Sequence, residues 1–153
     1  MAQALTLAEA AASMDEVPVG CVIVDGASGR VLAACGNRVE TLGDPTAHAE
    51  ILAIREACRH LGVPRLPECD LYVTLEPCAL CAAAISLARL RRVYFGAYDP
   101  KGGAVDHGPR WFAQPTCLHS PEVYGGFDEQ RAAQLLRSFF QARRPPRPGP
   151  LTP

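Results

Sequence analysis

The sequence predicts an α/β domain in which helices are layered on a central sheet. Short apolar segments typical of strands alternate along the chain with longer segments whose apolar residues recur at helical spacing. Alternation of this kind is typical of layered α/β folds. A length of 153 residues with 48% hydrophobic content is sufficient for one globular domain with its own core.

The first half of the chain predicts a helix, a hairpin and a second helix. The expected elements are a helix over residues 4–13, strands over 17–24 and 31–35 joined by a turn at 25–29, and a helix over 48–61. The first helix is rich in alanine, and the two strands are rich in valine and isoleucine. Gly62 and Pro64 close the second helix, because neither residue favours its continuation.

The second half predicts two further strands and two further helices. The expected elements are a strand over residues 70–75, a buried helix over 78–90, a strand over 93–97 and an amphipathic helix over 128–142. Residues 102–126 are dense in Gly and Pro and predict a loop with a small strand near Val123. Prolines end the last helix, so we expect one domain over residues 1–144 and a proline-rich, disordered tail over 145–153.

Composition excludes some classes of protein. No run of about 18 apolar residues is present, and the N-terminus lacks the features of a signal peptide. We therefore expect a cytoplasmic protein with no membrane contact. The seven cysteines are an odd number with one close pair, so we expect free thiols rather than a disulfide framework. The net charge of −1 means that any RNA contact must come from a local patch.

One imidazole, two thiols and a spare carboxylate form the most informative pattern in the chain. His48-Ala49-Glu50 precedes Pro77-Cys78 and, three residues after Cys78, Cys81. Three protein ligands leave the fourth tetrahedral position of a zinc ion open for water, as in catalytic rather than structural zinc sites. The His48–Glu50 segment and the Cys78–Cys81 pair each lie at a predicted helix start, where the helix dipole favours a thiolate over a thiol.

Other interpretations of these residues explain less of the pattern. A C-x-x-C pair alone also occurs in redox proteins and in half of a structural zinc site. The chain has no second C-x-x-C to close a structural site, and a redox pair would need neither His48 nor Glu50. Cys117 and His119 lack further partners for a second metal, and we expect an ordinary structural role for them, as for His60 and His107.

The H-x-E and P-C-x-x-C elements together match the known signature of the zinc nucleobase deaminases. The wider sequence resembles the bacterial tRNA-specific adenosine deaminases over nearly all of residues 5–144. The resemblance is carried by the stretches at 17–20, 37–38, 44–51, 71–78, 91–97 and 99–103, and by Phe139-Phe140 and Arg143-Arg144. It implies a three-layer α/β/α, cytidine deaminase-like fold with a five-stranded mixed sheet.

The resemblance also implies the reaction and its partners. The wobble adenosine of an arginine tRNA would become inosine with release of ammonia, in a homodimer that holds the anticodon loop across both subunits. One Zn²⁺ per subunit, held by His48, Cys78 and Cys81, would lower the pKa of bound water from about 16 towards about 7. Glu50 would take the water proton, pass it to N1 of adenine and later protonate the leaving amine.

Further residues acquire roles from the same resemblance. Asn37 would hold the flipped nucleoside, the Ala49 N–H and the Glu76 carbonyl would flank the base edge, and Asp99 would contact the RNA backbone. From the residues alone, Asn37 could equally be a turn residue, and Asp99 a turn-initiating residue before Pro100. The candidates for RNA contact are Arg92, Lys101, Phe139, Phe140, Arg143 and Arg144. The two aromatic residues could equally form the apolar face of the last helix.

Three rivals and three departures from the family pattern remain. A deaminase of free guanine, cytosine or their nucleosides would share the zinc signature, whereas a pseudo-deaminase should lack Glu50. The riboflavin-pathway deaminase would need a longer cysteine spacing and commonly a fused reductase. The departures are a short first helix, Tyr98 in place of the expected arginine, and the variant loop at residues 106–111. None of them touches the metal ligands.

Overall fold

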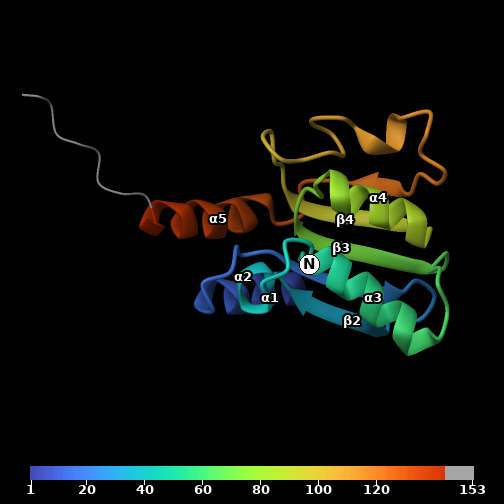
Figure 1. Ribbon diagram of the computed structural model, residues 1–153, viewed down its shortest axis with the longest axis horizontal. Coiled ribbons are helices and arrows are strands. Elements are labelled where there is room, and N and C mark those ends of the chain that lie inside the picture. Colours follow the sequence, from blue (N-terminus) through green and yellow to red (C-terminus); the bar gives the residue numbers. More distant parts are fainter. Residues whose placement is uncertain (144–153) are drawn as a thin grey trace, which may run out of the picture.

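The computed structural model describes residues 1–143. In that part the chain forms a five-stranded sheet in the order β2-β1-β3-β4-β5, with helices on both faces (Figure 1). The strands are β1 (Gly20–Asp25), β2 (Val31–Gly36), β3 (Cys69–Leu75), β4 (Arg92–Ala97) and β5 (Glu122–Tyr124). The helices are α1 (Ala2–Ser13), α2 (Val39–Leu42), α3 (Ala49–Leu61), α4 (Ala79–Ala88) and α5 (Glu129–Arg143), with a 3₁₀ turn, η1, at Trp111–Ala113.

The sheet is mixed, as the family resemblance implied. β1 pairs antiparallel with β2 and with β3, while β3, β4 and β5 run parallel. The connection from β3 to β4 passes through α4, which covers one face of the sheet beside α3. The carboxyl ends of β3 and β4 therefore lie together at one edge, next to the start of α4.

Two apolar clusters fill the space between the layers. The larger one joins α3 and α4 to the sheet and includes Ile23, Leu71, Ile85 and Phe95. The smaller one lies on the other face, where Leu5 of α1 meets Ala132 of α5. This arrangement confirms the three-layer prediction.

The alanine-rich first helix lies very close to β1. A Cβ atom on Gly20 would lie 2.8 Å from the backbone nitrogen of Ala8 and 2.9 Å from Cβ of Leu7. Small residues on the buried side of α1 make this approach possible. The helix is anchored by this contact although it spans only 12 residues.

The structure adds detail that the sequence pattern did not predict. The four residues of α2 are too few to show a helical period, and Gly43 in the left-handed region ends them. α3 and α4 begin one residue later than predicted, because His48 and Cys78 have extended backbones and are the N-cap residues. Among residues 1–143, no helix combines the length and the apolar character needed to cross a membrane.

Candidate active site and metal centre

Three potential metal ligands converge at the N-terminal ends of α3 and α4. The Nδ1 atom of His48 lies 3.5 Å from Sγ of Cys78 and 3.4 Å from Sγ of Cys81. All three ligand atoms lie within 4.8 Å of one another. Helix starts impose this convergence, because residues 78 and 81 lie one helical turn apart and direct both sulfurs to the same side.

These separations fit a zinc ion. With Zn–S bonds of about 2.3 Å and Zn–N bonds of about 2.0–2.1 Å, a tetrahedral centre requires an N···S distance of roughly 3.6 Å. The observed distances of 3.5 Å and 3.4 Å agree with that requirement. One nitrogen and two sulfurs are also the donor types that zinc prefers, and they leave one coordination position for water.

The protein environment prepares a thiolate at this site. The Cys81 thiol, followed by the His48 imidazole, lowers the pKa of Cys78 to about 4, although burial opposes the shift. The pKa of Cys81 is raised, because its neighbour Cys78 takes the negative charge first and burial disfavours a second one. A thiolate is the form of cysteine that binds a metal.

Glu50 is a buried carboxylate beside the ligands. Its side chain belongs to the first turn of α3, and the residue is only 4% exposed. Burial raises the pKa of Glu50 to about 7. A carboxyl group with a pKa near neutrality can both accept and donate a proton under physiological conditions.

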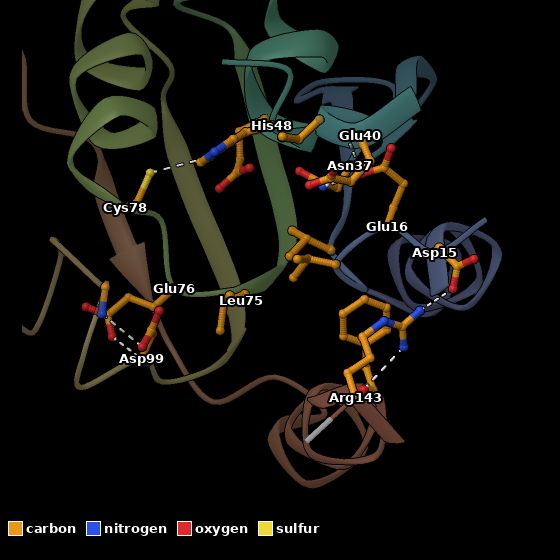
Figure 2. Close-up of a pocket in the computed structure, with 16 residues that line it drawn as sticks. Asp15, Glu16, Asn37, Glu40, His48, Leu75, Glu76, Cys78, Asp99 and Arg143 are labelled. Carbon is orange, nitrogen blue, oxygen red and sulfur yellow. Dashed lines mark hydrogen bonds and ion pairs between the residues drawn. The ribbon is translucent and has the colours of Figure 1, made fainter. Parts of the chain in front are cut away.

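A cavity of about 700 Å³ opens onto this centre. Its walls include His48, Glu50 and Cys78, while Cys81 is buried behind them. Figure 2 shows the side chains of His48 and Cys78 directed toward each other on one side of the cavity, with Arg143 on another side. The volume is within the range of small-molecule sites.

Asn37 lies in the wall of the cavity, and Glu16, a residue that the sequence analysis missed, holds it there. The Nδ2 group of Asn37 donates to the carboxylate of Glu16 at 2.9 Å. Glu16 is fully buried and also accepts from the backbone N–H groups of Glu40 and Thr41. The Oδ1 atom of Asn37 is thereby left to face a ligand.

Glu76 also has a role beyond the predicted one. Its buried carboxylate accepts backbone hydrogen bonds from Asp99 at 2.9 Å and from Val105, Asp106 and His107 at 3.2, 2.9 and 3.0 Å. Burial alone would raise the pKa of Glu76, but these hydrogen bonds outweigh it and hold the pKa below the ordinary value. The side chain therefore organises the loop that follows β4.

Asp99 is a turn residue that also lines the cavity. Its carboxylate accepts from the backbone N–H groups of Lys101 and Gly102, at 3.1 and 3.0 Å, as expected of a turn-initiating residue. The same residue lines the cavity. The turn thus fixes the carboxylate at the cavity wall.

The end of α5 closes another part of the cavity. Phe139 is buried and lines the cavity together with Arg143. The Arg143 guanidinium lies 3.6 Å from the centroid of the Phe139 ring and pairs with Asp15, which follows α1 (Figure 2). Phe139 therefore belongs to the apolar face of the helix and to the cavity at once.

The other predicted contact residues lie outside the cavity lining. Arg92, at the opposite end of β4 from the cavity, forms an ion pair with Glu122 at 2.9 Å. Phe140 is exposed on α5, and Lys101 is exposed beside Asp99. Ala49 is buried at the first position of α3, where its N–H has no partner within the helix. Arg144 and the predicted tail at 145–153 lie outside the described residues.

Cys117 and His119, the residues considered for a second metal site, form local hydrogen bonds. The seven cysteines all lie within residues 1–143, and none of them forms a disulfide bond there. Cys117 lies 3.4 Å from the hydroxyl of Ser86, and Nε2 of His119 lies 2.7 Å from the carbonyl oxygen of Leu90. These bonds attach the loop before β5 to α4 and to Leu90, which follows α4.

Residues 1–97, which contain the metal ligands and Glu50, match the family model for the cytidine and deoxycytidylate deaminase zinc-binding region. The match covers more than half of the chain. The chain therefore belongs to the cytidine and deoxycytidylate deaminase family, and His48, Cys78 and Cys81 form its zinc site.

Individual relatives place the chain in one branch of this family. A tRNA-specific adenosine deaminase of Agrobacterium fabrum (strain C58) is 58% identical over 144 residues, which are 94% of this chain and 93% of the relative. A solved structure from a study of A-to-I editing by tRNA:A34 deaminases at the wobble position of transfer RNA is 59% identical, with a TM-score of 0.87, and the alignment covers 89% of this chain and 97% of that one. Within its family, the chain belongs with the tRNA-specific adenosine deaminases.

A rival activity is represented among the solved structures as well. The guanine deaminase of Bacillus subtilis is 30% identical, with a TM-score of 0.63 over 99% of this chain and 96% of that one. Both identity and structural agreement are lower than for the tRNA:A34 deaminase structure.

Proposed function

We propose that the chain deaminates adenosine to inosine at the wobble position of an arginine tRNA and releases ammonia. The observation that carries the proposal is the joint presence of the zinc site and the agreement with tRNA-specific adenosine deaminases across nearly the whole chain. Asn37, Asp99 and the end of α5, which surround the cavity, supply contacts to more than a free base.

Glu50 is the proton carrier of the reaction. His48, Cys78 and Cys81 would hold the zinc ion, which would activate a water molecule as a nucleophile at neutral pH. The Glu50 carboxylate takes a proton from that water and delivers it to N1 of adenine. The oxygen of the water adds to C6 of adenine. Glu50 then takes the proton of the new C6 hydroxyl group and passes it to the exocyclic amine, which leaves as ammonia while C6 becomes a carbonyl. Burial, which raises the pKa of Glu50 to about 7, suits a group that must accept and donate in turn.

The cavity selects and orients the base. The target nucleotide must leave its stack, at a cost of a few kcal/mol that is smallest in a single-stranded loop such as an anticodon loop. Asn37, fixed by Glu16, holds the nucleoside, and the free N–H of Ala49 and the carbonyl of Glu76 flank the base edge. Asp99 contacts the backbone next to the target.

The RNA outside the cavity meets the end of α5. The stacked pair of Phe139 and Arg143 offers an aromatic face and a cation at the rim, which is the usual means of holding single-stranded RNA. Phe140, Arg144 and Lys101 extend this contact surface in the proposal, whereas Arg92, at the opposite end of β4, would meet a more distant phosphate. Arg92 would have to exchange Glu122 for a phosphate.

The active form is a homodimer in this proposal. On α4, Leu80 is 41% exposed and Leu87 is 70% exposed. These residues lie seven positions apart, which places them on the same side of a helix. An exposed apolar side next to the zinc ligands supports a partner copy at this position, with the RNA in contact with both subunits. Residues 1–144 form the single catalytic domain, and the substrate and the free thiols support a cytoplasmic location.

The proposed function can be tested with purified zinc-loaded protein. Transcribed arginine tRNA with adenosine at position 34, the same tRNA with guanosine there, free guanine and cytidine are supplied in parallel. We expect inosine and ammonia from the first substrate and no ammonia from the others. Turnover of guanine with an unedited tRNA would refute the proposal and favour the guanine deaminase activity.

A further inference from the structure

Two residues that depart from the family pattern contact each other in the structure. The rings of Tyr98 and His107 meet edge-on with their centroids 6.1 Å apart. Tyr98 in turn lies edge-on to the buried Phe95, at 5.0 Å. The position that we expected to hold an arginine therefore supports a histidine of the variant loop.

His107 completes the set of donors around the Glu76 carboxylate. Its Nδ1 atom lies 2.8 Å from Oε2 of Glu76, whose side chain is 0% exposed. An ionised carboxylate can only accept hydrogen bonds, so the ring proton resides on Nδ1. Together with the four backbone N–H groups of the loop described above, the imidazole gives Glu76 five donors from the segment 99–107.

The same segment is attached directly to the metal-ligand turn. The N–H of Ala104 donates to the carbonyl oxygen of Pro77 at 2.9 Å, and Gly103 pairs with Cys78 in an isolated bridge. A Cβ atom on Gly103 would lie 2.5 Å from Cδ of Glu76 and 2.6 Å from the carbonyl oxygen of Asp99. The loop that carries Asp99 thus has little freedom to move relative to Cys78.

We propose that His107 is a positioning residue: its imidazole, held between Glu76 and Tyr98, fixes the loop 99–107 so that Asp99 faces the RNA backbone beside the target adenosine. This inference rests on the proposed function for the role of Asp99. The imidazole acts through the loop and does not contact the reacting atoms.

Loss of the imidazole leaves the loop folded but less firmly held. The four backbone hydrogen bonds to Glu76 remain, and the His107 side chain is partly exposed, so water can replace it at the carboxylate. Loss of one hydrogen bond to a charged group is expected to raise the frequency of loop opening about tenfold.

Amide hydrogen exchange measures the frequency of loop opening without any substrate. We compare zinc-loaded wild type, His107→Ala, His107→Gln and, as a matched control, His60→Ala, which replaces an exposed histidine near the end of α3. The amides of residues 99 and 105–107 should exchange about tenfold faster in His107→Ala. His107→Gln keeps an N–H donor and should stay within about threefold of wild type. Unchanged exchange in His107→Ala overturns the inference.

A double-mutant cycle with Asp99 links the loop to the reaction. His107→Ala should raise KM for an A34 anticodon stem-loop about tenfold, with kcat within about twofold and zinc content unchanged. In an Asp99→Ala background, the same change should have no further effect on KM. An equal effect in both backgrounds overturns the inference, because His107 would then act elsewhere. A wild type that does not edit A34 refutes the proposed function instead, and the exchange rates then decide alone whether His107 holds the loop.

Discussion

Replacement of Glu16 by glutamine tests whether a buried carboxylate holds one wall of the cavity. Oε2 of Glu16 accepts from Asn37 Nδ2 at 2.9 Å and from the Glu40 N–H at 3.2 Å, while Oε1 accepts from the Thr41 N–H at 2.6 Å. Glutamine has the same shape, but one oxygen becomes an NH₂ group. At least one of the three donors must then face another donor.

The size of the effect follows from these bonds. Hydrogen bonds to a charged group contribute about 1.5–3 kcal/mol, and those between neutral groups about 1 kcal/mol. If glutamine places its carbonyl oxygen at the Oε2 position, each of the two hydrogen bonds there becomes weaker by about 1 kcal/mol. The hydrogen bond from the Thr41 N–H, which contributes roughly 2 kcal/mol, is lost. Water near the surface recovers part of this, so we expect a loss of about 3 kcal/mol and a melting temperature about 6–12 °C lower.

The effect must also depend on pH with a definite sign. Burial alone would raise the pKa of Glu16, but the hydrogen bonds from Thr41, Glu40 and Asn37 hold it below its ordinary value of 4.5. A depressed pKa in the folded state means that the stabilisation is complete above about pH 4.5 and is lost as the pH falls through the folded-state pKa. The difference between wild type and Glu16→Gln should therefore shrink below about pH 4.5.

Urea unfolding followed by circular dichroism over a pH series measures this difference. Glu68→Gln, at an exposed position, is the matched control and should stay within about 0.5 kcal/mol of wild type. Because the hydrogen bond that anchors Asn37 becomes weaker by about 1 kcal/mol, kcat/KM for A34 RNA should also fall about fivefold with zinc content unchanged. A difference below about 0.5 kcal/mol at neutral pH, or one that persists undiminished in acid, would refute the reasoning.

Three further changes test the site and the assembly. Glu50→Ala should keep its zinc, by elemental analysis, and lose at least about 10³-fold in kcat, because the proton carrier is gone; turnover like that of wild type would remove Glu50 from the mechanism. Cys81→Ser should lose most of its zinc to a chelator while Cys58→Ser, outside the site, retains it; equal retention would contradict the ligand assignment. Leu87→Glu should sediment as a monomer with its zinc still bound, whereas an unchanged sedimentation coefficient would place the dimer contact elsewhere.

The sequence predicted the order of the main elements because α3 and α5 repeat their apolar residues at helical spacing, while α4 and the strands are mostly apolar. The strand near Val123 was foreseen from its place between Gly- and Pro-rich segments, and β5 confirms it. By contrast, α2 has no buried residue. Without a buried face, its four residues carry no periodic signal, so no pattern could have revealed it.

The site, too, contains residues that could be predicted from the sequence and residues that could not. His48, Glu50, Cys78 and Cys81 were predictable because their chemistry is expressed in two short spacings. Glu16 was not, because its partners lie 21 to 25 residues away in the sequence. Such long-range polar pairs leave no local pattern. An acid beside an apolar strand is equally compatible with an exposed position.

Three buried glutamates surround the cavity, and their environments separate their functions. Glu16 and Glu76 accept several backbone N–H groups, which outweigh the effect of burial and lower the pKa of both. They therefore stay ionised and serve as anchors, one for Asn37 and one for the loop of Asp99. At Glu50 burial dominates and raises the pKa to about 7. Carboxyl groups with lowered pKa values remain charged and hold the structure, whereas a carboxyl group with a raised pKa can act as an acid and a base. Of the three, only Glu50 is poised to exchange a proton, and it is the one that lies beside the zinc ligands.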